Sequence, residues 1–355
     1  MDLASRIPAL LARARALLGL PGGPPDRLAA AEIGRAAMAV EALHEGLVGR
    51  RDLANVATYG ERAHLGAYLL WWWPQTYAKV KSVLRLVPDL PRGPRILDVG
   101  AGPAPAALAL LDALGGEAVA LDASEAALSE ARSLAGAAPL RTLRGDASVA
   151  KSAGGPFDVV VLANVLSEIP QPDRDGLVTT LPLAPGGHVL LIEPALRETG
   201  RALLAFRDRA LSRGFRAVAP CLTQRPCPAL ASPRDWCTAC EDWEPPPHVS
   251  QLADATGLRA DEALSYAPLV LAREAAEPRP GVWRVVGVAP PEKGKKRLWV
   301  CSDDGRLPLV RLDRDASPAN ARFDALRRGD LVEVEDAEQR GDGLRIVAAT
   351  RLATP

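Results

Sequence analysis

The sequence predicts an α/β protein in which a parallel sheet follows a helical region and precedes a small β-barrel. Apolar residues recur at helical spacing up to about residue 90, and short apolar runs then alternate with helical segments. Short strands separated by glycine-rich turns fill residues 281–355. Because alternating strands and helices imply a parallel sheet, we expect three parts: residues 1–90, 91–280 and 281–355.

The helical region contains three consecutive tryptophans, Trp71, Trp72 and Trp73, followed by Pro74. Proline is favoured in the first turn of a helix, so Pro74 predicts a helix start. Three adjacent side chains cannot all face one core. We therefore expect this helix to cover a pocket or to pack on the next domain; the alternative is an aromatic surface that faces the substrate.

The strands follow from short apolar runs bounded by turn residues. For the central sheet they are Arg95–Val99, Ala118–Leu121, Asp158–Leu162 and His188–Ile192. For the C-terminal part they are Val282–Val288, Leu298–Cys301, Leu307–Leu312, Leu331–Val334 and Leu344–Ala349. Five short strands in so short a stretch favour a small barrel of the OB type.

Composition limits the functional classes. Lysine plus arginine and aspartate plus glutamate are 43 each, so overall charge gives no argument for a polyanionic partner or a membrane surface. No apolar run is long enough to span a membrane, and we expect a cytoplasmic monomer. Five cysteines are too few for a disulfide scaffold, and four of them lie within residues 219–245. This clustering predicts a cysteine-rich metal insert.

A glycine-rich loop follows the first predicted strand of the sheet. Gly100 and Gly102 come directly after Asp98 and Val99, and glycines in such a strand-to-helix loop allow close approach to a ligand. The next strand ends in Asp122, about twenty residues on, where a carboxylate can accept ribose hydroxyls. Asp146 ends the following segment, where an adenine amino group could be met. These features predict a Rossmann-like nucleotide site.

This pattern resembles the class I S-adenosylmethionine-dependent methyltransferases, whose motifs read D-x-G-x-G, an acidic strand end and G-D-A. The resemblance implies that Asp98, Gly100 and Gly102 frame the methionine part of S-adenosylmethionine. Asp122 would then bind the ribose and Asp146 the adenine. A dinucleotide is disfavoured, because Pro103 and Pro105 stand where a third glycine is expected.

The sequence indicates the reaction less clearly than it indicates the cofactor. Amino-methylating enzymes of this fold often carry Asn/Asp-Pro-Pro-Tyr/Phe after the fourth strand, and this chain has Ala163-Asn164-Val165-Leu166-Ser167-Glu168 there. Asn164 and Glu168 are the candidates for contact with the reacting centre. Helix capping explains an Asn or Ser at this place equally well.

Four cysteines, Cys221, Cys227, Cys237 and Cys240, lie close in sequence, and Cys301 lies far downstream. Four thiolates in one protein select zinc or an iron-sulfur cluster. Cys237 and Cys240 have the spacing of one zinc knuckle, whereas Cys221 and Cys227 are too far apart for a second. The spacing alone leaves both metals open.

The cysteine motifs also resemble the methyltransferase-like family associated with the small ribosomal subunit, best known from mitochondria. The likeness rests on Ala219-Pro220-Cys221, Pro226-Cys227-Pro228 and Asp235-Trp236-Cys237, which follow Leu191-Ile192-Glu193-Pro194, and it spans about Tyr68 to Arg297. It implies a [4Fe-4S] cluster on Cys221, Cys227, Cys237 and Cys301, with Cys240 as the alternative fourth ligand. The chain departs from the family pattern at Leu222, Thr223 and Thr238, which leaves the ligand set open.

Basic residues flank the cysteines on both sides. Arg209, Arg213 and Arg216 have spacings that would place them on one helical face. Lys295, Lys296 and Arg297 precede the last cysteine. These two runs, beside a small barrel, predict RNA contacts made mainly to phosphates.

Together these features predict a methyltransferase-like protein that uses S-adenosylmethionine and a [4Fe-4S] cluster and acts on or binds ribosomal RNA of the small subunit. One alternative is a catalytically inactive RNA-binding assembly scaffold. Another is a small-molecule methyltransferase with a structural zinc site, which would leave the basic residues without a role.

Overall fold

The computed structural model describes residues 2–49, 61–87, 89–259, 263–274 and 280–355. The chain forms two compact units, each discontinuous in sequence. The first unit comprises Met1–Glu193 and Glu241–Leu264, and the second comprises Pro194–Cys240 and Ser265–Pro355. The boundaries predicted at residues 90 and 280 stay a prediction.

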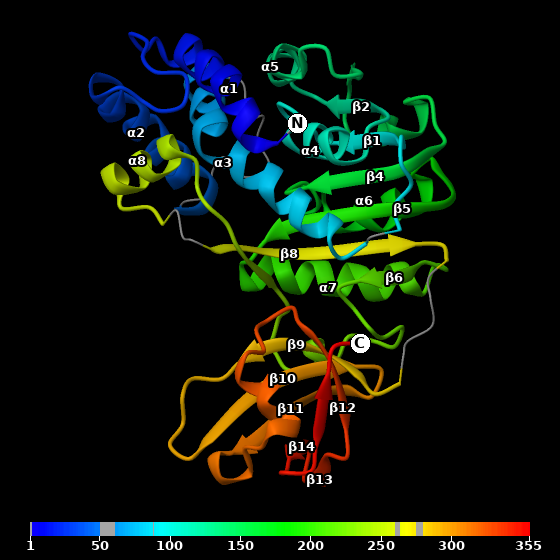
Figure 1. Cartoon of the computed structure of the whole chain (residues 1–355). Helices are drawn as coiled ribbons and strands as arrows, with labels where there is room; N and C mark the ends of the chain where they lie inside the picture. The colour runs from blue at the N-terminus through cyan, green and yellow to red at the C-terminus, as the bar shows by residue number, and fades with distance from the viewer. Residues whose placement is uncertain (1, 50–60, 88, 260–262, 275–279) are drawn as a thin grey trace. The chain divides into compact units, whose positions relative to one another are not determined.

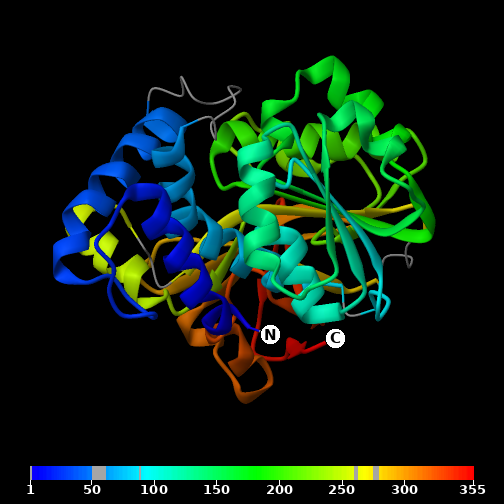
Figure 2. The ribbon, with the colours of Figure 1, turned by 90° about the horizontal axis from the view of Figure 1, so that it is seen from above.

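Helices dominate the first part of the first unit. They are α1 (Leu3–Leu18), α2 (Ala30–His44), the π-helix η1 (Glu45–Gly49), α3 (Arg62–Leu84) and, from much later in the chain, α8 (Pro247–Thr256). Helices α1 and α2 pack on α3, and α8 packs on α2 and α3 (Figures 1 and 2). The predicted helical region is therefore confirmed where it is described, although residues 50–60 and 88 lie outside the described residues.

Helix α3 corrects the predicted helix start. It begins at Arg62 and continues through Pro74, so Pro74 lies inside the helix. Trp71 and Trp73 are buried, whereas Trp72 is half-buried and stacks on Tyr68 and His44. Burial of an apolar face holds the helix together across the proline, whose ring removes one backbone hydrogen bond.

A parallel sheet completes the first unit. Its strands are β1 (Arg95–Val99), β2 (Glu117–Asp122), β3 (Leu140–Arg144), β4 (Phe157–Ala163) and β5 (Leu183–Pro194), in the order β3-β2-β1-β4-β5. The connecting helices are α4 (Pro105–Leu114), α5 (Glu125–Ala135), η3 (Ala147–Ser152), η4 (Leu166–Glu168) and α6 (Gln171–Thr180). All four pairings are parallel, and Leu97 lies opposite Val119 on one side and Val160 on the other.

The strand order reverses between β1 and β4, which lie side by side although two strands separate them in the chain. In open α/β sheets ligands bind at such a switch point, beyond the carboxyl ends of the strands. The four predicted strands are confirmed. The short edge strand β3 was not predicted, because its residues are mostly polar and only half-buried.

The core of the first unit is apolar because β1, β2, β4 and β5 are covered on both faces, as parallel strands require. Its most buried strand residues are Ile96, Leu97, Val99, Ala120, Leu121, Val159, Val160, Val161, Val189, Leu190 and Ile192. These side chains fix the positions at which the strands end, and hence where the loops after them begin.

The second unit contains α7 (Arg197–Leu211), β6 (Arg216–Ala219), the 3₁₀ helix η5 (Pro228–Ala231), half of β7 (Ala239–Asp242) and most of β8 (Ala263–Ala272). Strand β6 pairs antiparallel with β8. Helix α7 ends at Leu211, and Gly214, with φ of 83°, turns the chain into β6. Glycine is required at such a positive φ because other residues are strained there.

A curved sheet forms the rest of the second unit. Its strands are β9 (Val282–Val288), β10 (Lys295–Ser302), β11 (Gly305–Leu312), β12 (Leu331–Glu335), β13 (Glu338–Arg340), β14 (Gly343–Ile346) and β15 (Arg351–Ala353). Two 3₁₀ helices, η6 (Asp313–Asp315) and η7 (Pro318–Asp324), lie between β11 and β12. Its core consists of Trp283, Val285, Leu298, Val300, Leu309, Phe323, Leu326, Val332 and Ile346.

The predicted closed barrel is not confirmed. The strand order is β13-β14-β11-β10-β9-β12-β15, and within the described residues β13 and β15 remain the two ends of the sheet. The result is a half-barrel. Two strands beyond the five predicted, β13 and β15, are three residues each, too short to give an alternating apolar pattern.

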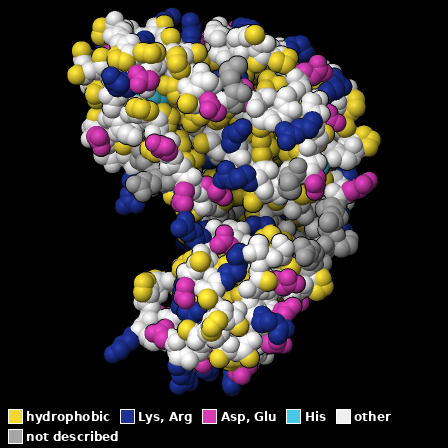
Figure 3. All heavy atoms as spheres, in the orientation of Figure 1, with side chains coloured by type: hydrophobic (Ala, Val, Ile, Leu, Met, Phe, Trp, Pro, Cys, Tyr) yellow, Lys and Arg dark blue, Asp and Glu magenta, His cyan; other side chains and the backbone are white. Residues whose placement is uncertain are grey.

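None of the described helices is long and apolar enough to cross a lipid bilayer. On the face drawn in Figure 3, basic and acidic side chains are interspersed over both units. This distribution agrees with the equal numbers of acidic and basic residues, and it means that any recognition of a polyanion must come from local groups of side chains.

Candidate functional site

The first candidate site lies where β1 passes into α4. Asp98 is 1% exposed, and its Oδ2 accepts a hydrogen bond of 2.9 Å from the backbone N–H of Ala107 in the first turn of α4. The indole N–H of Trp73 donates to the carbonyl of Pro103, which ties the loop to α3. The loop is thus held from both sides before any ligand binds.

Glycine is required in this loop for two reasons. Gly100 and Gly102 have φ of 68° and 54°, the left-handed region that favours glycine. A Cβ on Gly100 would lie 2.5 Å from the side chain of Val165, which follows β4. The loop therefore packs directly against the chain after β4, and the ends of β1 and β4 share one site.

Asp122 ends β2 and organises the same loop. Its Oδ2 accepts from the N–H of Gly102 at 2.7 Å, and its Oδ1 accepts from Ser124 at 2.8 Å. Burial raises the pKa of this carboxyl, and both N–H groups oppose that effect. Asp122, the residue predicted to bind the ribose, is thus hydrogen-bonded directly to the glycine-rich loop.

Asp146 has a different environment from the other predicted cofactor residues. It is exposed and caps η3, accepting hydrogen bonds from the backbone N–H of Ser148 at 2.8 Å and from its hydroxyl at 2.5 Å. Those bonds lower the pKa of its carboxyl. The N–H of Gly145 donates to the carbonyl of Asp122, which keeps the end of β3 beside the end of β2. The role of Asp146 at an adenine stays a prediction.

The chain after β4 carries the two predicted reaction residues. Asn164 has φ of 61°, and its N–H donates to the carbonyl of Ile192 on β5. A non-glycine residue in this conformation is uncommon and is frequent at functional sites. The Glu168 residue is exposed, yet desolvation of its carboxyl by the surrounding residues and the nearby charges of Glu193 and Asp122 raise its pKa to about 7.

Sequence reasoning did not select Glu193 as a site residue, although it ends the fifth strand. It is 1% exposed, and its Oε1 accepts from the N–H of Leu166 at 2.9 Å. Burial raises its pKa to about 7, while hydrogen bonds from Ser167 and Leu166 oppose the shift. A carboxylate directly after an apolar strand was the available signal.

Three carboxyl groups at the carboxyl ends of β1, β4 and β5 thus titrate near neutrality. Burial raises the pKa of Asp98 to about 7, and the charge of Asp122 adds to the shift. Glu168 and Glu193 reach the same value. Such a group of perturbed acids at a switch point is typical of binding and catalytic sites.

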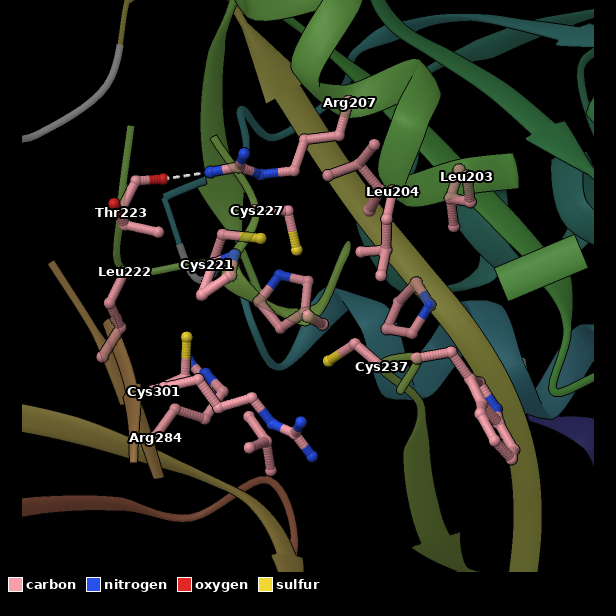
Figure 4. A pocket seen from close by; sticks show the side chains of 18 residues that line it. Leu203, Leu204, Arg207, Cys221, Leu222, Thr223, Cys227, Cys237, Arg284 and Cys301 are labelled. Carbon is pink, nitrogen blue, oxygen red and sulfur yellow. Dashed lines mark hydrogen bonds between the residues drawn. The ribbon is translucent and has the colours of Figure 1, made fainter. Parts of the chain in front are cut away.

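The second candidate site is a cavity of about 50 Å³ in the second unit. Cys221, Cys227, Cys237 and Cys301 line it, and their sulfur atoms are directed toward a common space (Figure 4). Three arginines, Arg207, Arg284 and Arg306, line the same cavity with mostly apolar side chains. Residues separated by 80 positions in the chain therefore meet here.

Helix α7 fixes the loop that carries the first two cysteines. Arg207 is fully buried and donates to the carbonyls of Thr223 and, at 2.9 Å, of Arg225. Asp208 pairs with Arg207 at 2.5 Å, and both of its oxygens accept from the N–H of Cys227. Adjacent residues on one helix turn thereby determine the position of the loop.

Strands β9 and β10 supply the other part of the cavity. Cys301 on β10 lies opposite Arg284 on β9, and Arg284 donates to the carbonyl of Gly329 at 2.7 Å. Cys240 is exposed, does not line the cavity, and lies 3.9 Å from the hydroxyl of Ser265. The geometry therefore brings together the first three cysteines and Cys301.

The four thiols lie close enough to affect one another. Burial raises the pKa of Cys237 and of Cys301 to about 12, and the charge of Cys221 adds to both shifts. Burial also raises the pKa of Cys227. Among the described residues, no group of three or more His, Cys, Asp or Glu side chains is arranged to hold a single metal ion.

The predicted RNA-binding residues are only partly arranged as expected. Arg209 lies on α7, but Arg213 follows the helix and Arg216 begins β6, so the prediction of one helical face is wrong. The helix ends at Leu211, before it reaches Arg213. Each of these three arginines already interacts with other residues of the chain.

The second basic run lies at the start of β10. Lys295 and Arg297 both pair with Glu292, at 2.8 and 3.2 Å, and Lys296 donates to the carbonyls of Phe323 and Asp324. These contacts occupy the three charged groups within the second unit. Their role toward RNA stays a prediction.

The strand order, the glycine loop and the acidic strand ends define a Rossmann-like α/β domain with a candidate cofactor site. A family model described as mitochondrial small ribosomal subunit Rsm22 matches residues 62–319. The chain belongs to this family. The resemblance inferred from the cysteine motifs is thereby confirmed. No curated protein sequence matches the chain significantly.

Solved structures similar to the chain are S-adenosylmethionine-dependent methyltransferases. A putative RNA methyltransferase from Pyrococcus horikoshii is 15% identical, with 56% of this chain and 84% of that chain covered and a TM-score of 0.37. TrmN from Thermus thermophilus is 20% identical, with 57% of this chain and 52% of that chain covered and a TM-score of 0.35. Magnesium protoporphyrin IX methyltransferase from Synechocystis, with bound S-adenosylmethionine, is 15% identical, with 66% of this chain and 97% of that chain covered and a TM-score of 0.38.

The raised pKa of Asp98 predicts a pH dependence of stability. Because its pKa is about 7 in the folded protein against 3.8 for the free side chain, folding favours the protonated form. This contribution is complete below about pH 4 and is lost as pH rises through about 7. The loss is at most roughly 4 kcal/mol. Asp98→Asn should therefore lose less stability between pH 5 and pH 8 than the parent protein.

The measurement is thermal unfolding of ligand-free protein at several pH values. Asp158→Asn is the matched control, since Asp158 lies at the other end of the sheet, where it accepts from the N–H of Arg95. The control should keep the pH dependence of the parent. Equal pH dependence of the Asp98 variant and the parent would contradict the account.

Proposed function

We propose that this protein binds S-adenosylmethionine in its first unit, holds a [4Fe-4S] cluster in its second unit, and binds ribosomal RNA of the small subunit. The observation that carries the proposal is the convergence of Cys221, Cys227, Cys237 and Cys301 on one cavity in a chain of the Rsm22 family. The description of that family supplies the ribosomal partner.

The cofactor assignment is supported by the first site. The glycine loop leaves room for close approach, and Asp122 is fixed at the end of β2, where a ribose would be bound. Asp98 is buried behind the loop and holds the start of α4. The acidic character of the site suits the positive charge of a sulfonium and an amino group better than it suits a pyrophosphate.

The residues of the cavity fit an iron-sulfur cluster. Thiolates are the ligands that iron-sulfur clusters prefer, and each binds its own iron atom. A zinc site would need four ligands within about 2.3 Å of one ion, and the described residues offer no such group. The cluster carries net negative charge with four thiolates, and Arg207 and Arg284 can offset it. When bound, such a cluster would supply a cross-link or an electron carrier.

Binding of RNA is supported by the description of the family. Because the overall charge of the chain is zero, any attraction to RNA must come from local positive charge. Arg225 on the cysteine loop is exposed, although it pairs with Asp303 at 3.3 Å. Exposed ion pairs contribute little energy and exchange readily with a phosphate. RNA contacts are therefore expected in the second unit.

Substitution of Asp122 tests the cofactor site. Asp122→Asn should weaken S-adenosylmethionine binding about 10- to 100-fold, because a hydrogen bond to a charged group contributes roughly 1.5–3 kcal/mol. Calorimetric titration measures the change, with Asp158→Asn as the control. Unchanged affinity for S-adenosylmethionine in a folded variant would show that Asp122 does not bind the ribose.

Two cysteine variants test the cluster and its ligands. After anaerobic purification, the parent protein and Cys240→Ser should be brown, with broad visible absorption and bound iron. Cys301→Ser should lose most of that absorption, because Cys301 lines the cavity and Cys240 does not. The measurements are the visible spectrum and metal analysis. A colourless parent protein that contains one zinc ion would contradict the assignment of an iron-sulfur cluster.

Methyl transfer to RNA is a second candidate function, favoured by the backbone of Asn164 and the pKa of Glu168. A carboxyl group that titrates near pH 7 can act as a general base. With labelled S-adenosylmethionine and immature small subunits, an active enzyme should label RNA, and Glu168→Gln should reduce the rate at least tenfold. Intact RNA binding with no transferred label would reject this candidate and leave the binding function.

A further inference from the structure

A groove of about 570 Å³ lies in the second unit beside the cysteine cavity. Its wall is formed by the chain before β7, by the end of β9 and by β10, β11 and the turn before β12. The lining residues that carry the argument are Arg234, Trp236, Arg297, Trp299, Arg306 and Arg328. Trp236 and Arg306 line the groove and the cavity alike.

Trp236 is held as an exposed aromatic platform. It is 39% exposed, which is unusual for so large an apolar side chain. Its indole N–H donates to the carbonyl of Ala195 at 3.2 Å, and its ring lies against Gly200, where a Cβ would be 3.0 Å from the ring. The ring is therefore fixed without being covered.

Trp299 and Arg306 continue this platform. The Arg306 guanidinium lies 5.1 Å from the centre of the Trp299 ring, and it also pairs with Asp235. Trp299 lies across Gly287 of β9, which has no side chain to separate the ring from the strand. Indole and guanidinium planes are the surfaces on which unpaired bases stack.

The charge of the groove suits a polyanion. Its lining includes four arginines against two acidic residues, Asp235 and Glu292. Those two pair with Arg306 and Arg297. Arg234 and Arg328 are exposed at the groove and add positive charge beyond these pairs. Aromatic planes flanked by arginines favour single-stranded nucleic acid over an apolar peptide.

We infer that this groove binds a short single-stranded segment of RNA, with bases stacked on Trp236 and the Arg306–Trp299 pair and phosphates at Arg234 and Arg328. The inference rests on the proposed RNA-binding function and locates it. It also differs from the sequence-based expectation, in which phosphate contacts by two basic runs dominated; of those runs, only Arg297 lines the groove. Because Trp236 precedes Cys237, the platform is continuous in the chain with the cysteine cavity.

The test measures binding of fluorescein-labelled 12-nucleotide RNA, single-stranded or as a duplex, to the full chain by anisotropy. The parent protein should prefer the single strand. Trp236→Ala should weaken that binding at least fivefold and Trp236→Phe much less, because stacking on an aromatic ring contributes roughly 1–3 kcal/mol per base. Trp243→Ala is the matched control, since Trp243 is half-buried in the first unit.

A second variant does not alter the platform. Arg234→Gln with Arg328→Gln should reduce the slope of log affinity against log salt by about 1.4, since each phosphate contact on a single strand contributes roughly 0.7. If both groove variants bound single-stranded RNA as tightly as the parent protein, the inference would be overturned. The proposed function would be unaffected by that result. No RNA binding by the parent protein would reject the proposed function itself. A preference for duplex, or for a peptide over RNA, would also overturn the inference.

Discussion

The ion pair between buried Arg207 and half-buried Asp208 is the constraint on which the cysteine loop of the second unit depends. A guanidinium that is fully buried must have its charge balanced, and here one neighbour on the same helix turn does so. Its two terminal nitrogens also donate to the carbonyls of Arg225 and Thr223, and Asp208 accepts from the N–H of Cys227. The cysteine loop, which has little regular structure of its own, is thus defined by α7.

The cysteine cavity follows from this constraint, and the groove lies beside it. On one side of the loop, Cys221 and Cys227 face Cys237 and Cys301 across the cavity. On the other, Trp236 lies exposed along the groove, with its indole N–H fixed by Ala195. A cluster bound in the cavity would join residues 194–240 covalently to the half-barrel.

Much of the first unit could be predicted from sequence because its signals are local. An apolar strand, two glycines and an acidic strand end occur at fixed offsets, so Asp98, Gly102 and Asp122 were found, and the structure links the last two directly. Glu193 was overlooked because its position at the end of an apolar strand is a weak signal without a second residue at a fixed spacing. Its importance arises from burial beside Glu168, which only the fold reveals.

The second unit was predicted less well because its contacts join distant segments. Spacing could not choose between Cys240 and Cys301, since β10 reaches the cavity only through the pairing of the half-barrel. Arg207 and Arg284 were not distinguished from surface arginines for the same reason. The open edges at β13 and β15 depend on which strands pair, a property that residue patterns do not encode.

The central claim is that α7 organises the cysteine loop before any metal binds. Amide hydrogen exchange of iron-free protein tests this directly, because the N–H of Cys227 is protected only while Asp208 holds it. The account predicts slow exchange at Cys227 in the parent protein and much faster exchange in Asp208→Ala, with the amides of β1 and β4 unchanged as an internal reference. Equally fast exchange at Cys227 in the iron-free parent and the variant would contradict it.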